Sequence, residues 1–429
     1  MSNASLLAIF ARYPEPGRVK TRLAADVGDR PACALYKGMV HRILSTADRW
    51  AERSGRRVRV FSTSAPDSRW HHWLGDDRDI RPQRGTDLGE RMHNALADAL
   101  EEGFDRAMCI GTDLPGLTRE QLDCADDALA RNDVVAGPSR DGGYYLIGLR
   151  RPAPELFQGI QWSTGEVFSA TRAAADKSGL SFSAIESLND IDTTDDLWGA
   201  AGPVSVIIPA LNESDIIADA VHRVRLLGPA EIIVADGGSS DGTREKAENA
   251  GARVVESEPG RGTQCNAGAA AAGGDTLWFL HADCRPEPLA VWDIGQALSN
   301  DEVVGGAFEL GLDRSTLWLK IIEKTANWRS HLWGKPYGDQ GLFVRGNVFR
   351  RIGGFPDWPL MEDVELARRL RRAGRVTIVP RPVLASARRW LRGGVLRTYM
   401  TMKLTQWGYL LGAAPESLAR FYERGQIQG

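Results

Sequence analysis

Long apolar runs and paired cysteines are both missing from this 429-residue chain. No window approaches the roughly 20 consecutive apolar residues that a membrane-spanning helix needs. The five cysteines, at positions 33, 109, 124, 265 and 284, show no CxxC spacing, so they indicate neither a disulfide framework nor a zinc site. The first residues, MSNASLLAIFARYPEP, lack the long apolar core of a secretory signal peptide and favour a first strand instead. We therefore expect a cytoplasmic protein.

An excess of basic charge is also absent. The chain has 53 Lys and Arg residues against 56 Asp and Glu residues, a formal net charge of −3. Such a chain has no global positive field to hold a phosphate backbone, so we expect no nucleic-acid partner. The apolar content of 43% and the charged content of 25% are ordinary for a globular protein. The length favours two or three domains, at roughly 150 residues each.

Strand-like and helical segments alternate in the first half of the chain. We expect strands at 5–10, 58–63 and 107–111, with helices at 31–50 and 88–102. This alternation predicts an α/β fold with a parallel sheet and crossover helices. Because ligands bind beyond the carboxyl ends of such strands, polar residues that follow a strand are the candidate site residues.

A basic loop follows the first expected strand. It places Gly17, Arg18, Lys20 and Arg22 within six residues. Glycine lets the backbone approach a ligand, and Arg and Lys neutralise phosphate oxygens, so we predict phosphate binding. A solvated basic loop is the alternative. The loop is not a P-loop, because the GxxxxGK spacing followed by Ser or Thr is absent.

Three acidic residues of the first half are further candidates. Asp113 follows a buried strand, and a carboxylate there suits Mg²⁺ or Mn²⁺. Asp192 is the candidate for a second metal carboxylate, although Thr193 or Thr194 beside it can equally cap a short helix. Asp141, in a glycine-rich loop, is either a second polar contact to the ligand or the centre of an Asx turn.

A short Gly-, Ala- and Pro-rich stretch at 197–203 separates the two halves. The pattern then restarts with an apolar run at 204–209, a new first strand. We place the boundary near residue 201, which predicts domains at 1–200 and 201–429. The two halves show no obvious sequence repeat.

In the second half, the apolar run 277–280 is followed at once by His281, Asp283 and Arg285. A carboxylate at a strand end suits a hard divalent cation, but a post-strand Asp is also a common helix N-cap. Pro286 marks a point where a helix can start.

Other polar residues follow expected strands or begin expected helices. Asp236 ends the strand at 231–235 and can accept hydrogen bonds from a ribose or a base edge. Asn212 is placed to cap a helix that begins near residue 214. The pair Glu362 and Asp363 opens an amphipathic helix, and these two carboxylates are our catalytic candidates. Capping alone is the alternative, because the helix dipole favours negative charge at this position. The donor-binding candidates are Pro209, Asn212, Glu213, Asp236, Arg261, Asn266, Gln340, Arg388 and Arg389.

The motifs PEPGRVKTRL, GTDLP, PSRDGGYYLIGL, Trp162-Ser-Thr164 and DIDTTDDL occur in this order in the first half. Together they resemble the radical-SAM/selenodomain-associated transferase of the first type. That family is similar to the nucleotidyltransferase branch of the GT-A fold. The resemblance implies a GT-A domain with a nucleotide site.

The second half contains VSVIIPALNE, IIVADGGSSDGT, GRGTQCNAGA, LHAD, YGDQGLFVR and MEDVELARRL. These motifs resemble the family-two inverting glycosyltransferases of GT-A fold, and most closely the second-type selenodomain-associated, or arsenosugar-biosynthesis, transferase. The resemblance implies that Asp236 binds the nucleoside, that Asp283 binds the metal and that Asp363 is the catalytic base. His281 stands where an Asp usually starts the metal motif.

We therefore expect two tandem GT-A domains. The second would move a sugar from a nucleotide diphosphate to a hydroxyl acceptor, with Mg²⁺ or Mn²⁺ and with inversion, while the first handles a nucleotide. Alternatives are a nucleotidylyltransferase whose second half binds the product, and a non-catalytic nucleotide-sugar-binding scaffold. The acceptor is a small molecule or a lipid. For the tail 394–411 we expect one of three roles: packing on the domain, covering the acceptor or lying on a membrane surface. For a helix at 315–330 we expect either a place beside the acceptor or a place in the core.

Overall fold

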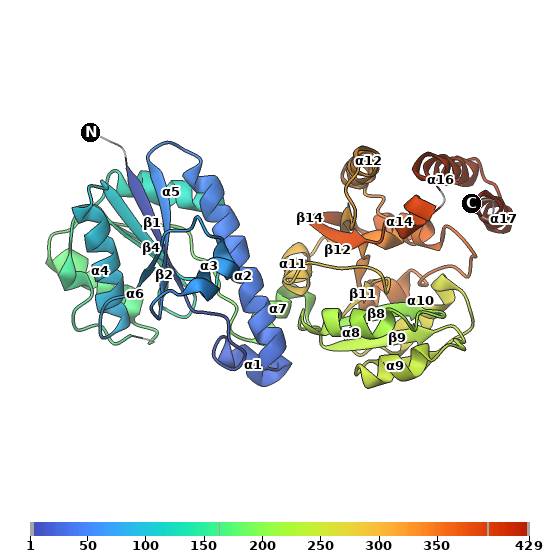
Figure 1. Ribbon diagram of the computed structural model, residues 1–429, viewed down its shortest axis with the longest axis horizontal. Helices are drawn as coiled ribbons and strands as arrows, with labels where there is room; N and C mark the ends of the chain where they lie inside the picture. Colours follow the sequence, from blue (N-terminus) through green and yellow to red (C-terminus); the bar gives the residue numbers. More distant parts are fainter. Residues whose placement is uncertain (1–3, 163, 393, 427–429) are drawn as a thin grey trace. The chain divides into compact units, whose positions relative to one another are not determined.

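The computed structural model describes residues 4–162, 164–392 and 394–426, apart from the side chains at 333, 389, 392, 396, 425 and 426. The chain forms two compact units, Met1–Asp196 and Leu197–Gly429 (Figure 1). Ser163, which belongs to one of the quoted motifs, lies outside the described residues. The assignment of separate functions to 1–200 and 201–429 stays a prediction.

The first unit is built on a seven-stranded sheet of order β3-β2-β1-β4-β6-β5-β7. Its strands are β1 Ser5–Ala11, β2 Arg56–Ser62, β3 Ile80–Pro82, β4 Arg106–Ile110, β5 Val134–Pro138, β6 Tyr144–Leu149 and β7 Phe182–Ala184. Its helices are α1 Thr21–Val27, α2 Asp29–Ala51, α3 Ser68–Leu74, α4 Leu88–Glu101, α5 Arg119–Leu129 and α6 Val167–Lys177, with η1 at Pro154–Leu156. The short helix α7, Thr194–Trp198, follows.

The sheet is mixed rather than fully parallel, because β6 runs antiparallel to both β4 and β5. The expectation of a parallel sheet is wrong at this strand. The physical reason is the short link between β5 and β6, residues 139–143, which closes as a turn with a hydrogen bond from Ser139 N to Gly143 O of 3.1 Å. A parallel neighbour would need a crossover of a dozen or more residues.

Both faces of the first sheet are buried. Leu7 and Ile9 of β1 belong to one apolar cluster, whereas Leu6 and Ala8 belong to a second. Alternate residues of a strand point to opposite faces, so helices cover the sheet on both sides. This explains the continuous apolar run from which β1 was predicted.

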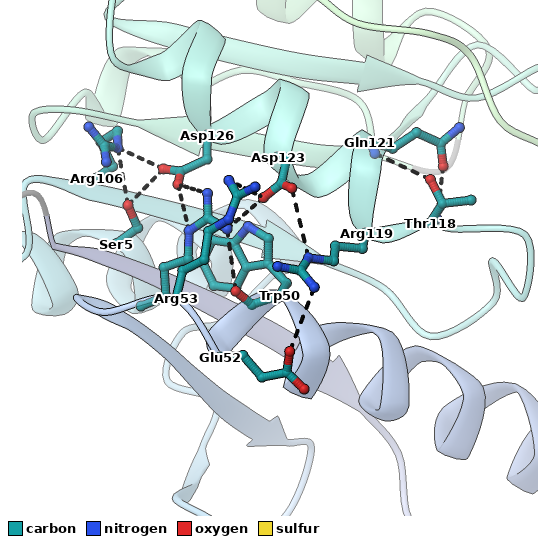
Figure 2. Close-up of polar contacts among 11 residues, drawn as sticks. Ser5, Trp50, Glu52, Arg53, Arg106, Thr118, Arg119, Gln121, Asp123 and Asp126 are labelled. Atoms are coloured by element: carbon teal, nitrogen blue, oxygen red, sulfur yellow. Dashed lines mark hydrogen bonds and ion pairs between the residues drawn. The ribbon is translucent and has the colours of Figure 1, made fainter.

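A buried polar network ties helix α5 to the strands beside it (Figure 2). Asp126 of α5 accepts hydrogen bonds from Ser5 Oγ at 2.7 Å, Arg106 Nε at 2.7 Å and Arg56 Nη2 at 2.8 Å. The Arg56 guanidinium also lies 4.6 Å from the centre of the Trp50 ring. Each buried charge therefore has partners, which is the condition for tolerating charge in an apolar interior.

The second unit has a sheet of order β10-β9-β8-β11-β13-β12-β14, the same arrangement as in the first unit. Its strands are β8 Val204–Ala210, β9 Glu231–Asp236, β10 Arg253–Glu256, β11 Thr276–Phe279, β12 Val303–Leu312, β13 Phe343–Arg345 and β14 Arg375–Ala385. Its helices are α8 Ile217–Arg225, α9 Thr243–Asn249, α10 Arg261–Ala271, α11 Ala290–Ala297, α12 Leu317–Trp333, α13 Gly346–Arg351, α14 Glu362–Ala373, α15 Arg388–Arg392, α16 Val395–Leu410 and α17 Pro415–Gln426, with η2 at Gly199–Ala201 and η3 at Gly338–Gln340. The prediction of an α/β protein with two such sheets in tandem is confirmed.

Two expected helix starts are wrong. The helix after Pro286 begins only at Ala290, because Pro288 disfavours helical backbone in the residue before it. The helix after Asn212 begins at Ile217 and has no side-chain cap.

None of the described helices combines the length and the apolar character that crossing a bilayer requires.

Candidate functional site

A cavity of about 530 Å³ opens in the second unit, beyond the carboxyl end of β11. Its polar wall comes from the starts of α10, α14 and α15, from the loop after β11 and from η3 with the residue before it, and its more apolar wall comes from the rest of α15 and from α16 and α17. The polar wall includes Arg261, His281, Asp283, Tyr337, Asp339, Glu362, Asp363 and Arg388. Several residues singled out in the sequence therefore line one space.

His281 and Asp283 lie in the turn that follows β11. One ligand atom each from His281, Asp283 and Cys284 lies within 4.8 Å of the others, the one such group of three in the described part of the chain. Burial raises the pKa of the Cys284 thiol well above its ordinary value. Asp283 and His281 offer one carboxylate and one imidazole, which suit a divalent cation such as Mn²⁺.

Asp363 lies close to His281 across a glycine. Its Oδ2 accepts a hydrogen bond of 2.7 Å from the Gly338 backbone N–H. A Cβ atom on Gly338 would lie 3.3 Å from Asp363 Oδ2 and 3.3 Å from His281 Nε2. Asp363, the candidate base, and His281, a candidate metal ligand, thus both lie next to Gly338, which has no side chain to separate them.

Glu362 is buried beside Asp363 and pairs with Arg261, whose Nη1 lies 3.4 Å from Glu362 Oε1. Burial and the negative charge of Asp363 raise the pKa of Glu362 to about 7. Arg261 is the first residue of α10 and Glu362 is the first residue of α14, so this ion pair joins the starts of the two helices. The cavity therefore contains a carboxyl group that titrates near neutral pH.

Asp236 is fully buried at the end of β9. Its Oδ2 accepts hydrogen bonds from Gly238 N and Ser239 N, each at 3.0 Å, and from Arg244 Nε at 2.6 Å. Its Oδ1 has no hydrogen-bond partner among the described residues. A buried acceptor without a partner fits a donor from a ligand, such as a ribose hydroxyl or a base N–H. Asp236 is not among the residues that line the cavity.

The loop after β8 lies at the same edge of the sheet. Burial and the negative charge of Asp283 raise the pKa of Glu213. Pro209 pairs in register with Ala235 of β9. Asn212, at φ 55°, does not cap α8 as expected, because its Oδ1 accepts a hydrogen bond of 3.0 Å from Ser240 N.

Two donor-binding candidates have structural partners instead. Asn266 donates to Phe355 O at 2.9 Å and accepts from Phe355 N at 3.0 Å, so its amide clamps a loop. Gln340 is fully buried, donates to Phe308 O at 2.9 Å and accepts from Ser330 Oγ at 2.9 Å. Gln340 has no exposed surface, so the expectation that it faces the donor is corrected, whereas a donor contact of the half-buried Asn266 stays a prediction.

One of the two candidate arginines after β14 lines the cavity. Arg388 is exposed at the start of α15, lines the cavity and donates from Nε to Ser386 Oγ at 3.1 Å. The side chain of Arg389 lies outside the described side chains.

In the first unit, Lys20 joins the two predicted metal carboxylates. Its Nζ lies 2.9 Å from Asp113 Oδ2 and 2.9 Å from Asp192 Oδ1. Burial by itself lowers the pKa of Lys20, but the charges of Asp113 and Asp192 outweigh it and raise the pKa overall. The ammonium group thus lies between the carboxylates that we predicted would hold a cation, and Lys20 takes a left-handed backbone, φ 50°, to place it there.

The other candidates of this loop are more exposed. Arg18 pairs with Glu15 at 3.3 Å, and Arg22 lies 3.3 Å from Asp192 Oδ2, each with a side chain about four-fifths exposed. Gly17 has φ 78°, and a Cβ on it would lie 3.3 Å from Asp29.

Asp141 forms the Asx turn that was the alternative for it, since its Oδ1 accepts hydrogen bonds from Ser139 Oγ and from Gly143 N. Sequence reasoning missed Asp190, whose pKa is raised by burial and by the charges of Asp192 and Asp141. Its spacing of two residues from Asp192 was the available signal.

Covering the acceptor was one of the roles expected for the tail 394–411, but the individual residues of the more apolar wall of the cavity were not predicted. Trp390, Thr398, Met402 and Thr405 contribute to it from α15 and α16. No motif marks these residues, because their role depends on how the tail folds back over the start of α14.

Comparison with known proteins identifies both halves. Residues 46–164 match the family described as an uncharacterized protein conserved in bacteria (DUF2064), and residues 205–355 match glycosyl transferase family 2. The chain is 33% identical over 181 residues to an uncharacterized glycosyltransferase, MT1564, of Mycobacterium tuberculosis, covering 40% of this chain and 69% of that protein.

Other curated relatives are matched over shorter parts. A glucosyl-3-phosphoglycerate synthase of Mycolicibacterium paratuberculosis is 36% identical over 118 residues, 24% of this chain and 36% of that protein. A probable glycosyltransferase of Bacillus subtilis, YdaM, is 30% identical over 200 residues, 40% of this chain and 47% of that protein. The chain thus spans less than half the length of these two relatives.

Solved structures are also similar. A putative nucleotide-diphospho-sugar transferase from Desulfovibrio desulfuricans is 34% identical, with a TM-score of 0.42, covering 46% of this chain and 84% of that chain. A mannosyltransferase from Pyrobaculum calidifontis, in complex with GDP-Man and Mn²⁺, is 19% identical, with a TM-score of 0.40, covering 52% of this chain and 68% of that chain.

The prediction of two GT-A domains from these families is confirmed. Through its second unit the chain belongs to the family 2 glycosyl transferases, and its first unit carries a domain of the bacterial DUF2064 family.

Proposed function

We propose that the second unit transfers a sugar from a nucleoside diphosphate donor to an acceptor hydroxyl group, with inversion at the anomeric carbon. The observation that carries this proposal is the convergence of Asp363, Asp283 with His281, and Arg261 on one cavity. An acceptor base, a cation site and a fixed positive charge are the groups that a direct displacement of a diphosphate requires.

Asp363 is the proposed base that takes the acceptor proton. Its carboxylate accepts backbone hydrogen bonds of 2.7 Å from Gly338 N and from Val364 N, at the start of α14. These two hydrogen bonds hold the carboxylate in place where it lines the cavity. Because a hydroxyl group is a much weaker acid than a carboxyl group, we propose that the proton leaves late, when the sugar carbon has already become cationic.

The leaving diphosphate needs positive charge. Arg261 and Arg388, which both line the cavity, are placed to contact its oxygens. Asp283 and His281 would hold a divalent cation, which when bound neutralises charge on the diphosphate. The mannosyltransferase noted above was solved with Mn²⁺, and a glucosyl-3-phosphoglycerate synthase of Mycobacterium tuberculosis with Mn²⁺ and UDP, which supports this assignment by analogy.

The nucleoside part of the donor would contact Asp236 through its unpartnered Oδ1. Glu213, in the loop after β8, would lie between the nucleoside and the cation. Pro209 and Asn212 would border the same nucleoside site.

A panel of nucleotide sugars tests this proposal. We expect one donor to be hydrolysed slowly with Mn²⁺ and without an acceptor, and we expect Asp363→Asn to lower kcat by about a hundredfold or more with little change in the donor KM. Asp301→Asn, an exposed turn position outside the cavity, is the matched control. Full activity of Asp363→Asn would remove the base from the mechanism, and no turnover with any donor would favour the scaffold alternative.

For the first unit we propose nucleotide handling at the cluster of Lys20, Asp113 and Asp192. The supporting observation is the buried ammonium group of Lys20, itself part of the basic loop, which lies within ion-pair distance of both carboxylates. Release of pyrophosphate from a nucleoside triphosphate and a sugar phosphate would identify a nucleotidylyltransferase. We expect Lys20→Met to abolish that release while the second unit still hydrolyses its donor. Release that persists undiminished in Lys20→Met would separate the activity from this cluster.

A further inference from the structure

We propose that helices α12 and α16 form a docking surface for a bilayer with anionic headgroups. The two helices contact each other and lie at the same end of the second unit (Figure 1). We call their outward apolar side chains the apolar face. This inference goes beyond the proposed function and does not depend on it.

Helix α12 has two apolar sides. Leu319, Ile322 and Ala326 are buried in the unit. Leu317, Ile321, Trp328 and Leu332 fall within about 60° of one another around an ideal helix, roughly opposite the buried side. Leu317 is 73% exposed, Trp328 61% and Leu332 59%. A helix that only packed on its own domain would need one of these sides, not both.

Helix α16 repeats this arrangement. Met400, Leu404, Trp407 and Leu411 follow the spacing i, i+4, i+7 and i+11 and form one stripe. Trp407 is 63% exposed and Leu411, which directly follows the helix, is 84% exposed. The other side of α16 lines the cavity with Thr398, Met402 and Thr405. Two neighbouring helices therefore expose apolar stripes while their inner sides are occupied.

The charge around the apolar face is positive, although the whole chain has a net charge of −3. Helix α12 carries Lys320 and Lys324 against Glu323, while its Arg329 stacks on the Tyr337 ring; α16 carries Arg397 and Lys403 with no acidic residue. On helical wheels, Lys324 and Arg397 lie next to the exposed stripes. Long basic side chains beside a stripe of Trp and Leu can reach lipid phosphates while the stripe enters the interface.

A bilayer explains these features together. Cores of protein–protein interfaces are depleted in Lys, whereas interfacial membrane helices combine exposed Trp and Leu with flanking Lys and Arg. The attraction of basic side chains to anionic lipid adds to apolar burial and falls as salt screens it. We therefore expect binding that needs both the stripe and the charge.

Co-sedimentation of the full-length protein with vesicles tests the inference. We expect binding to vesicles of phosphatidylglycerol and phosphatidylcholine, at least tenfold weaker binding to phosphatidylcholine alone, and loss of most binding in 0.5 M salt. The triple variant Leu404→Gln, Trp407→Gln, Leu411→Gln should weaken binding at least tenfold. The matched control is Leu88→Gln with Leu226→Gln, which changes exposed leucines away from the apolar face and should bind normally.

Two results would overturn the proposal. One is the absence of vesicle binding by the wild-type protein. The other is a wild-type dimer in analytical ultracentrifugation that the triple variant converts to a monomer, because the apolar face would then join two copies of the chain. Hydrolysis of the sugar donor, measured on the same samples without vesicles, reports separately on the proposed function.

Discussion

At the scale of single residues, Gly338 matters because it has no side chain. Its backbone N–H fixes Asp363, and the space where a Cβ would lie is bordered by Asp363 Oδ2 and His281 Nε2. The residue therefore sets how closely the candidate base and the candidate metal ligand approach.

We predict that Gly338→Ala lowers kcat by about tenfold, since the added methyl group would have to displace one of two atoms that lie 3.3 Å away. The unfolding temperature should change little, because the backbone of Gly338 is not left-handed. Steady-state kinetics with thermal unfolding checks this. Gly111→Ala is the control, since its Cβ would meet nothing within 4 Å. An unchanged kcat would show that this spacing is not critical.

A second residue-scale prediction concerns pH. The pKa of Glu362 is raised to about 7 from 4.5. A raised pKa stabilises the folded state at low pH, and this stabilisation is lost as pH rises from about 4.5 through about 7. Glu362→Gln, which cannot ionise, should therefore gain about 2 kcal/mol relative to wild type between pH 5 and pH 8. Urea unfolding of the second unit at both pH values measures this difference. A pH-independent difference would contradict the prediction.

Residue roles that depend on distant partners were the hardest to predict from the sequence. The candidate carboxylates Asp283 and Asp363 were found because each follows a strand or begins a helix, where chemistry is concentrated in this type of fold. Gln340 was misassigned, because its partner Phe308 is 32 residues away along the chain, and the contact of Asn266 with Phe355, 89 residues away, was not predicted either. The pairing of Lys20 with Asp192 spans 172 residues and was equally inaccessible.

At the scale of elements, helix α16 depends on α14 for part of its attachment. Tyr409 Oη donates a hydrogen bond of 3.0 Å to Glu365 Oε2. The hydrogen bond from Arg368 lowers the pKa of Glu365 to about 2, so the acceptor is ionised at neutral pH. Hydrogen bonds to a charged group contribute roughly 1.5–3 kcal/mol.

We predict that Tyr409→Phe loosens α16 and raises the acceptor KM by about threefold to tenfold, while the donor KM stays unchanged. Amide hydrogen exchange should become faster in α16 but not in α14. Tyr399→Phe on the same helix is the control. Equal exchange rates in Tyr409→Phe and wild type would show that packing alone holds the helix.

The sequence predicted the buried parallel strands well. The runs at 5–10 and 204–209 correspond to β1 and β8, because strands covered on both faces are continuously apolar. The antiparallel direction of β6 and β13 was not predicted, since an apolar run carries no direction. The individual residues of α16 that line the cavity were not predicted either, because their packing depends on contacts with α14.

At the scale of the whole molecule, the two units have their own sheets and their own apolar clusters. We predict two calorimetric transitions. Asp126→Asn breaks a buried ion-pair network of the first unit and should cost about 3 kcal/mol, lowering one transition by roughly 10 °C and leaving the other unchanged. Asp127→Asn, its exposed neighbour, is the control. A shift of both transitions together would show that the units unfold as one.

Helix α16 has one side in the cavity and the opposite side exposed. Thr398, Met402 and Thr405 line the cavity, while Leu404 and Trp407 are exposed. A membrane or partner that binds the exposed side of α16 therefore also restrains the side that lines the cavity. By thermodynamic linkage, binding at the exposed side then changes the substrate affinity of the cavity, and substrate binding changes the affinity of the exposed side by the same factor. Turnover would accordingly respond to the surroundings of the helix as well as to the concentrations of donor and acceptor.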